Sequence, residues 1–324
     1  MPVLASPASL KGVLTAVEAA MALAAGFRNE GVDADAVPVA DGGEGTAEVV
    51  AAARGGVWRS AAVSDPLGRT VEARFLVLDD GSAVAEAAEA VGLRRLAPHE
   101  RDPLRASSRG VGELLLAAAE TSTGELVVGL GDTATVDGGA GMREVVGDRL
   151  GGRRLVAACD VRNPLLGPRG AARAFGPQKG ASPQVVEELE RRLGAMEDLR
   201  SFAETPGAGA AGGLGAALAA LGAELVSGAT LVLELVSFRA QLPGATLVVT
   251  GEGTVDRSTT EGKAPGEVIA LCRAEGVRCA LFGGRVDEAP DGVEVYELPG
   301  GPERAADDLV ALGERLGRAL LGVA

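Results

Sequence analysis

Short apolar runs that end in glycine-rich turns recur along the whole chain. Runs of this kind cover residues 37–39, 126–128, 155–158 and 247–249, and each leads into a turn that carries an acidic residue. Three or four apolar residues bounded by such turns are typical of buried parallel strands. Helical patterns separate several of these runs, and this alternation is the βαβ signature, in which ligand groups gather where strands end. The sequence therefore predicts an α/β protein built on a parallel sheet.

Both ends of the chain carry this alternation. A first strand at residues 3–5 precedes a helix that runs through Phe27, and Thr15 with Glu18 forms the capping box that opens it. Near the other end we expect a strand at residues 279–282 that ends at a pair of glycines. A strand at residues 293–295 and a closing helix from Ala305 follow it. The two ends therefore read as parts of one α/β domain.

The pattern changes to hairpins after Gly55-Gly56. Residues 57–63 and 71–78 read as strands, and Asp65-Pro66-Leu67-Gly68 supplies a tight turn between them. Helices are expected after the hairpins at residues 86–91 and 110–120 and, behind the serine cap at Ser182, at 183–196. An antiparallel element that interrupts α/β repeats predicts a second domain in the middle of the chain.

Residues 246–263 form the most informative single stretch. Its strand is expected to stop at Gly251-Glu252-Gly253, where two glycines would let a ligand approach bare backbone amides. Asp256, Thr259 and Lys263 follow, just before an apolar segment that reads as a helix. Amide dipoles and a lysine would attract phosphate, and the carboxylate would hold magnesium. The spacing is not that of a P-loop, and a plain strand-to-helix turn with solvated charges is the alternative.

The residues of other turns also allow either a functional or a purely structural interpretation. Asp41 and Glu44 lie in a glycine turn and fit a metal or hydroxyl site, but also ordinary turn chemistry and helix N-terminal charge. The loop at residues 129–141 is dense in glycine, hydroxyls and carboxylates. The glycines of residues 206–215 predict a close approach of backbone to a ligand or to another helix.

Composition excludes several classes of protein. Aromatic residues make up only 2% of the chain, so the core must consist mostly of Ala, Val and Leu. The net charge of −14 argues against a general binder of nucleic acids or anionic membranes. Three unevenly spaced cysteines indicate neither a zinc site nor a disulfide framework, and no apolar run reaches membrane-spanning length. We therefore expect a cytoplasmic protein, and the sequence leaves homo-oligomer formation open.

A histidine-based catalytic triad is not expected. The chain has a single histidine, His99, which lies between a proline and a glutamate in a polar segment. A surface loop is the better interpretation for such a position.

The ordered motifs resemble those of the bacterial glycerate kinase family, of the type often called glycerate kinase I. The resemblance spans nearly the whole chain, and the motifs become specific through their order. The matching segments are residues 9–12 (Ser-Leu-Lys-Gly), 39–46 (Val-Ala-Asp-Gly-Gly-Glu-Gly-Thr), 65–68 (Asp-Pro-Leu-Gly), 133–135 with 137–142, 158–161 with 163–165, 175–180 (Phe-Gly-Pro-Gln-Lys-Gly), 209–215 and 250–253 (Thr-Gly-Glu-Gly).

This resemblance implies a two-domain α/β enzyme that uses ATP and magnesium to phosphorylate D-glycerate. A Rossmann-like parallel-sheet domain would combine residues 1–55 with 240–324, and residues 56–239 would form an inserted mixed α/β domain with hairpins. The active site would lie in the cleft between the domains. Its partners would be the two small-molecule substrates, with no nucleic acid and no membrane.

The residues that would carry the reaction come from the matching motifs and, for Asp256 and Lys263, from the stretch 246–263. Asp41 or Asp160 would accept the hydroxyl proton, Lys11 would assist, and Asp256 with Asp160 would hold magnesium. Glycines, hydroxyls and charged groups of several loops would bind substrate or phosphate: Gly42, Gly43, Thr46, Thr133, Thr135, Asp137, Gly251, Gly253 and Lys263.

The chain also departs from the family pattern inside these motifs. Family members typically have an aspartate where this chain has Ala8 and an asparagine where it has Val136. Other departures are Asp132, Arg109, Thr254 and Ser258, and the segment between Met142 and Leu155 looks shortened. The leading hypothesis is an active glycerate kinase that forms 2-phosphoglycerate. The alternatives are a catalytically weakened homologue that binds a nucleotide or small acid, and a kinase for a related hydroxy acid.

Overall fold

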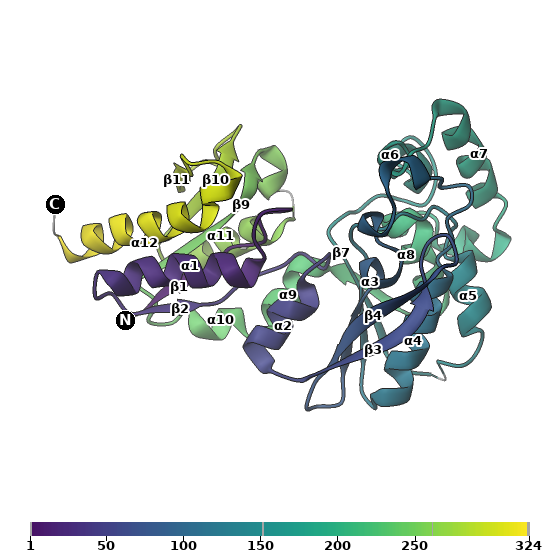
Figure 1. Ribbon diagram of the computed structural model, residues 1–324, viewed down its shortest axis with the longest axis horizontal. Helices are drawn as coiled ribbons and strands as arrows, with labels where there is room; N and C mark the ends of the chain where they lie inside the picture. The colour runs from purple at the N-terminus through teal and green to yellow at the C-terminus, as the bar shows by residue number, and fades with distance from the viewer. Residues whose placement is uncertain (1, 151, 261, 323–324) are drawn as a thin grey trace. The chain divides into compact units, whose positions relative to one another are not determined.

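The strands form two separate sheets in the computed structural model, which describes residues 2–150, 152–260 and 262–322 (Figure 1). One sheet has the strand order β11-β10-β9-β1-β2, and the other has the order β3-β4-β5-β6-β7-β8. Backbone contacts divide the chain into two units, one around each sheet. Unit 1 consists of Met1–Asp41, Glu48–Arg54 and Ala229–Ala324, and unit 2 consists of Gly42–Ala47 and Gly55–Gly228.

Unit 1 contains a fully parallel sheet made from both ends of the chain. β1 lies between β2 and β9, and β10 joins β9 to β11. The α/β class, with a parallel sheet contributed by both chain ends, is thus confirmed. The strands are β1 (Val3–Ala5), β2 (Ala34–Ala36), β9 (Leu247–Val255), β10 (Cys279–Val286) and β11 (Glu294–Glu297).

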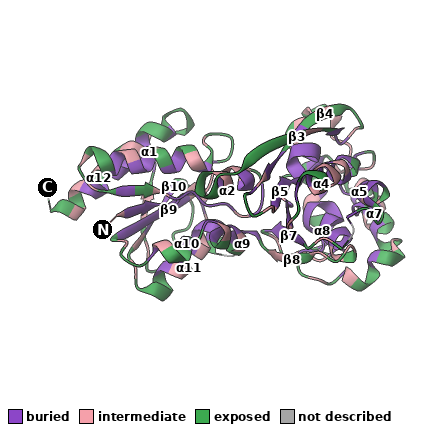
Figure 2. Ribbon diagram, turned by 90° about the horizontal axis from the view of Figure 1, so that it is seen from below, coloured by how far each residue is buried: buried purple, intermediate pink, exposed green. Residues whose placement is uncertain are grey.

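Helices cover both faces of this sheet because successive residues of a buried strand point to opposite sides. Val3 packs in the core beneath α1 (Ala16–Asn29) and α12 (Ala305–Leu321), whereas Leu4 packs on the side of α11 (Ala264–Glu275). Figure 2 shows β9 and β10 buried between these two layers. The short helices α9 (Gly228–Leu235) and α10 (Phe238–Gln241) and most of α2 (Thr46–Arg54) complete the unit.

Unit 2 contains a mixed sheet that begins with the expected hairpins. β3, β4 and β5 are antiparallel neighbours, and β5 through β8 run parallel. Asp65 closes the first turn by accepting the amides of Leu67 and Arg69. The strands are β3 (Val57–Ser64), β4 (Thr70–Val77), β5 (Ala83–Glu86), β6 (Leu126–Gly129), β7 (Leu155–Cys159) and β8 (Glu224–Ser227).

The helices of unit 2 pack around one apolar core. This core is mostly Ala, Val and Leu, as the composition predicts, and it includes Val136 and Met142. The helices are α3 (Ala87–Val91), α4 (Arg109–Thr121), α5 (Ala140–Val146), α6 (Ala171–Phe175), α7 (Pro183–Gly194) and α8 (Ala210–Ala220). Single 3₁₀ turns follow several of them, including one at Leu93–Arg95 and one at Pro98–Glu100, where His99 is exposed. The division of the chain at residues 55 and 240, and the cleft expected between the domains, stay predictions.

Two strand assignments are wrong. The expected strand at residues 37–39 instead lies at Ala34–Ala36, since Pro38 has no amide hydrogen to donate to a neighbouring strand. The expected glycine turn at Gly251–Gly253 is a continuous part of β9. A Cβ on Gly251 would lie 2.4 Å from the carbonyl oxygen of Phe282 on β10, so this glycine permits close strand packing, not a turn.

Several element boundaries also differ. β10 continues through Gly283 and Gly284 to Val286. Glu86 ends β5, so the helix expected from that residue begins at Ala87. The glycine-rich residues 206–215 already contain the start of α8 at Ala210, and its backbone is left-handed at Ala211–Gly213.

Two expectations from composition can be compared with the structure directly. Cys159, Cys272 and Cys279 are all free thiols, so no disulfide joins them. None of the helices within the described ranges combines the length and the apolar character needed to span a membrane.

Candidate functional site

The segment Gly42–Ala47 packs against the carboxyl ends of β6 and β7 in unit 2. A Cβ on Gly131 would lie 2.5 Å from the Cα of Gly43, and one on Gly129 would lie 2.6 Å from the carbonyl oxygen of Gly42. Gly42 itself has a positive φ of 87° and contacts Ala158 of β7. The absence of side chains at three of these positions therefore lets two loops meet backbone to backbone.

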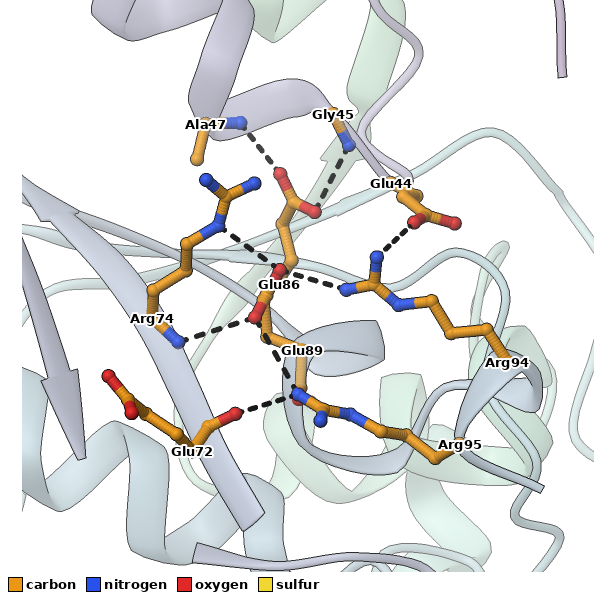
Figure 3. Close-up of polar contacts among 9 residues, drawn as sticks. All are labelled: Glu44, Gly45, Ala47, Glu72, Arg74, Glu86, Glu89, Arg94 and Arg95. Carbon is orange, nitrogen blue, oxygen red and sulfur yellow. Dashed lines mark hydrogen bonds and ion pairs between the residues drawn. The ribbon is translucent and has the colours of Figure 1, made fainter. Parts of the chain in front are cut away.

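Glu86, the last residue of β5, fixes the same segment. Its Oε1 accepts a hydrogen bond from the amide of Ala47 at 2.7 Å, and its Oε2 accepts one from Gly45 at 3.1 Å (Figure 3). The side chain is buried, and burial raises the pKa of this carboxyl to about 7, although the two amides favour its charged form. Thr46 lies between the two amides, and its buried Oγ1 has no hydrogen-bond partner among the described residues.

An ionic network surrounds this contact. Glu89 of α3 forms ion pairs with Arg94 at 2.8 Å and with Arg74 at 3.4 Å. Arg94 also pairs with Glu44 at 2.5 Å, and Figure 3 shows how it bridges the two carboxylates. Glu44 therefore has a guanidinium partner at this turn, and both of its interpretations stay predictions.

Lys179 connects to the second loop of the site. Its Nζ donates to the carbonyl oxygen of Thr135 at 2.8 Å and to Oγ1 of Thr133 at 3.2 Å. Only 3% of this lysine is exposed, and burial lowers its pKa to about 7 against the opposing charges of Asp137 and Asp132. Sequence reasoning did not single out Lys179, although the segment 175–180 that carries it was among the matching motifs.

Asp137 holds the loop together from within. Its Oδ2 accepts hydrogen bonds from the amide and hydroxyl of Ser108, both at 2.8 Å, and from the amide of Gly141 at 3.3 Å. Its Oδ1 accepts one from Gly139 at 3.1 Å. The carboxylate thus orders the loop that carries Thr133 and Thr135, and its role in substrate binding stays a proposal.

The glycines of α8 explain how this loop is seated. Gly212 has a positive φ of 71°, and a Cβ on it would lie 1.9 Å from the carbonyl oxygen of Thr135. The expected close approach at residues 206–215 is therefore an approach of backbone to backbone. Thr135 is fully buried there, and no described residue forms a hydrogen bond with its Oγ1.

Asp160 follows β7, at the same carboxyl end of the sheet as the loop after β6. Gly129 of β6 is in register with Ala158 of β7. Gly131 and Asp160 each lie two residues beyond this pair. Asp160 is exposed, whereas Cys159 before it is buried. Burial, helped by the charge of Asp160, raises the pKa of the Cys159 thiol to about 11, so this thiol is inert at neutral pH.

Unit 1 carries a second group of candidate residues around Lys263, the N-cap residue of α11. Lys263 Nζ lies 3.0 Å from Oε2 of Glu252 and 4.0 Å from Oδ1 of Asp256. The hydroxyl of Thr259 donates to Oε1 of Glu252 at 2.7 Å. The lysine, the hydroxyl and two carboxylates of this stretch are therefore brought together.

The carboxylate of Asp256 is held in its charged form. The amide and hydroxyl of Ser258 both donate to its Oδ1, and these bonds together with the nearby charge of Lys263 lower its pKa. Asp256 also lines an open concavity with Arg257, Ser258, Asp287 and Glu288. Ser258, a departure from the family pattern, thus contributes directly to the electrostatics of the site.

The structure sorts the expected site residues into two groups. The turn that carries Lys11 passes beside Gly253, whose added Cβ would lie 3.8 Å from the amide nitrogen of Lys11. Asp41 is the last residue of unit 1 before Gly42. Unit 1 holds Lys11, Asp41, Gly251, Gly253, Asp256 and Lys263, and unit 2 holds Gly42, Gly43, Thr46, Thr133, Thr135, Asp137 and Asp160.

Comparisons with known proteins agree over most of the chain. The model of the glycerate kinase family matches residues 3–151 and 146–299. Glycerate 2-kinase of Escherichia coli (strain K12) is 42% identical over 305 residues, which cover 82% of this chain and 80% of that protein. Glycerate kinase of Bacillus subtilis (strain 168) is 38% identical over 92% of this chain and 88% of its own length.

A solved structure has the same fold. The crystal structure of a provisionally assigned glycerate kinase 2 from Salmonella typhimurium LT2 superposes with a TM-score of 0.87 at 33% sequence identity. The match covers 99% of this chain and 98% of that one. The two family matches overlap at residues 146–151, within the segment that looks shortened in the sequence.

Proposed function

The chain belongs to the glycerate kinase family, and we propose that it transfers the γ-phosphoryl group of ATP to D-glycerate. The name of the Escherichia coli relative favours the 2-hydroxyl as the acceptor, which would give 2-phosphoglycerate. The observation that carries the proposal is that four family motifs meet at the carboxyl ends of the strands of unit 2. Gly42–Ala47, the Thr133 loop, Asp160 and Lys179 all belong to it.

Phosphoryl transfer requires positioning and charge more than covalent chemistry. In the proposed reaction, Asp160 or Asp41 accepts the hydroxyl proton while the hydroxyl oxygen attacks the γ-phosphorus, and the bond to the bridging oxygen of ADP breaks. The amides of Gly42 and Gly43 and the hydroxyl of Thr46 bind substrate oxygens. The unpartnered hydroxyl of Thr46 supports this assignment, because a buried hydroxyl normally has a hydrogen-bond partner.

The nucleotide phosphates are assigned to the group around Lys263. The lysine charge at the start of α11, together with the neighbouring helix amides, attracts anions. Lys11 lies beside Gly253 in the same unit, and both complete this assignment, whereas the buried Gly251 would act only through its place in β9.

Magnesium fits the donor chemistry of the proposed site. Mg²⁺ at nucleotide sites takes one or two carboxylates and completes its shell with phosphates and water. Across residues 2–150, 152–260 and 262–322, no three His, Cys, Asp or Glu side chains form a group that could hold a metal ion alone. Asp256, whose pKa is lowered, would offer the ion a carboxylate in unit 1, and Asp160 would offer one in unit 2; the bound ion would neutralise charge on the phosphates.

We place this reaction in the cytoplasm, where ATP is supplied and the three free thiols stay reduced. Turnover of D-glycerate with ATP and MgCl₂, followed through enolase without a phosphoglycerate mutase, tests both the activity and the 2-position. A signal that appears only after the mutase is added would identify the product as 3-phosphoglycerate. Absence of turnover in both formats would contradict the proposal.

Matched variants identify the proton acceptor. Asp160→Asn and Asp41→Asn are compared with Asp148→Asn, which removes an exposed carboxylate from a turn outside the motifs. Loss of kcat in only one of the first two, with Asp148→Asn unchanged, names the base.

One observation favours a second candidate, a homologue that binds the substrates without efficient turnover. Val136 is 2% exposed and packs in the core of unit 2, so its apolar side chain offers substrate no polar group. Calorimetric binding of ATP or glycerate by a chain that shows no turnover would support this candidate. Recovery of turnover in Ala8→Asp would show which group was missing, and a panel of hydroxy acids would reveal a different substrate.

A further inference from the structure

The segment Gly42–Ala47 changes units twice within a short length of chain. The residues before it, Met1–Asp41, and those after it, Glu48–Arg54, belong to unit 1, whereas the segment itself belongs to unit 2. Both Gly42 and Gly45 have positive φ, which glycine adopts without strain, so the segment turns sharply. Glycine-rich backbone alone would fix the position of this segment poorly, so side-chain contacts are needed to hold it.

Glu86 supplies these contacts and anchors the segment. It bonds the amides on both sides of Thr46, at 3.1 Å to Gly45 and 2.7 Å to Ala47, from a side chain only 5% exposed. These amides lie at the start of α2, so the carboxylate also occupies the positive end of that helix. An anion such as a phosphate cannot use the same amides while Glu86 holds them.

We propose that Glu86 is a positioning residue for phosphoryl transfer: its carboxylate fixes the Gly42–Thr46 loop on unit 2 and so places the substrate-binding groups of that loop. This inference rests on the proposed glycerate kinase function. It assigns a role to a residue outside the family motifs, and it places the phosphates elsewhere than at the start of α2.

The charges around Glu86 make its hydrogen bonds to the amides of Gly45 and Ala47 depend on pH. Glu89 and Glu44 raise its pKa further, and Arg74, Arg94 and Arg95, which face the same cluster, are engaged with Glu89 or with backbone carbonyls (Figure 3). With a pKa near 7, Glu86 takes up a proton on the acid side of neutrality. The neutral carboxyl then keeps one good acceptor for two amide donors, and the loop loosens.

Two variants test the inference. Glu86→Gln keeps the shape but turns an NH₂ group toward one of the amides, and Glu89→Gln removes a neighbouring, largely buried carboxylate that does not contact the loop. We expect Glu86→Gln to lower kcat on the order of 10- to 100-fold and to flatten the acid limb of the kcat/KM profile. Glu89→Gln should keep the limb but move its midpoint below the wild-type value near pH 7, because the charge of Glu89 raises the pKa of Glu86.

Amide hydrogen exchange of the peptide covering residues 42–48 provides a readout independent of turnover. Faster exchange in Glu86→Gln than in the wild type and in Glu89→Gln supports the anchor. Unchanged exchange, or an unchanged kcat and acid limb, overturns it. If the wild type itself shows no turnover, the proposed function fails, and exchange alone decides whether Glu86 holds the loop. Should Glu86→Gln fail to fold, Glu86→Asp, which is too short to reach both amides, replaces it in each assay.

Discussion

The two groups of candidate residues respond to their surroundings in opposite ways. Around Lys263 in unit 1, partly exposed charges pair with one another, and the pKa of Asp256 falls, so its charge is reinforced. In unit 2 burial dominates, and the pKa values of Glu86 and Lys179 move toward about 7 from opposite sides. Asp256 in unit 1 therefore keeps its charge over the physiological range, whereas Glu86 and Lys179 in unit 2 titrate within it.

Packing also differs between Gly212 in unit 2 and Gly253 in unit 1, and variants of these two glycines test this difference most strongly. Gly212→Ala adds a Cβ 1.9 Å from a carbonyl oxygen at a φ of 71° and should cost about 3 to 4 kcal/mol. Gly253→Ala meets nothing closer than 3.8 Å and should change stability by about 1 kcal/mol at most. Urea unfolding of both variants measures this, and equal losses would contradict the contrast.

The next largest effect is a dependence of stability on pH. Between its unfolded pKa of 4.5 and its folded pKa of about 7, Glu86 holds its proton in the folded state and releases it in the unfolded state. Folding therefore loses stability as pH rises through that window, by up to about 3 kcal/mol. Relative to the wild type, Glu86→Gln should be most destabilised near pH 5, and its deficit should shrink by pH 8.

Asp256→Asn is the matching variant from unit 1. Because the folded pKa of Asp256 lies below 3.8, its stabilising contribution is complete above that pH and is lost only as pH falls through the folded pKa. Its effect on unfolding should not change between pH 5 and 8. A slope for Asp256→Asn, or none for Glu86→Gln, would break the comparison.

A smaller effect separates two lysines. Lys179→Met leaves the carbonyl of Thr135 without its buried donor and should cost about 1 to 3 kcal/mol. Lys263→Met removes a partly exposed ion pair and should cost less than about 1 kcal/mol. Thermal unfolding of the two variants at pH 7 tests this order, and a larger loss in Lys263→Met would reverse it.

The smallest expected change concerns substrate binding in unit 1. Asp256→Asn should leave stability within about 1 kcal/mol of the wild type, because a partly exposed ion pair contributes little. It should raise the KM for ATP with magnesium while kcat for any remaining turnover changes less. An unchanged KM across a magnesium titration would remove Asp256 from the proposed metal site.

Local sequence signals predicted much of the fold because their partners are close in the chain. Thr15 and Glu18 form the expected capping box, and Ser182 caps its helix through the amide of Val185. The turn at Asp65 closes the first hairpin as expected. In each case the donor and the acceptor lie within a few residues, so spacing alone identifies them.

The features that sequence reasoning missed depend on partners that are distant in the chain. Gly251 reads as a turn residue, but the close contact that requires it is with Phe282 on another strand. Glu86 and Lys179 find their partners about 40 residues away, where no local spacing records them. One signal could have identified Lys179: the chain has only three lysines, Lys11, Lys179 and Lys263, and the first two lie in recognised motifs, the third in the central stretch.

The parallel sheet of unit 1 also bears on how the chain is made. β1 pairs on one side with β2 and on the other with β9, whose partner residues are 244 positions further along. During synthesis the ribosome releases β1 and α1 long before β9, β10 and α12 exist, whereas every strand of unit 2 emerges in one uninterrupted stretch. Unit 2 can thus assemble first, while the apolar side of α1 must wait, and chaperones that shield such surfaces would act on this chain during that delay.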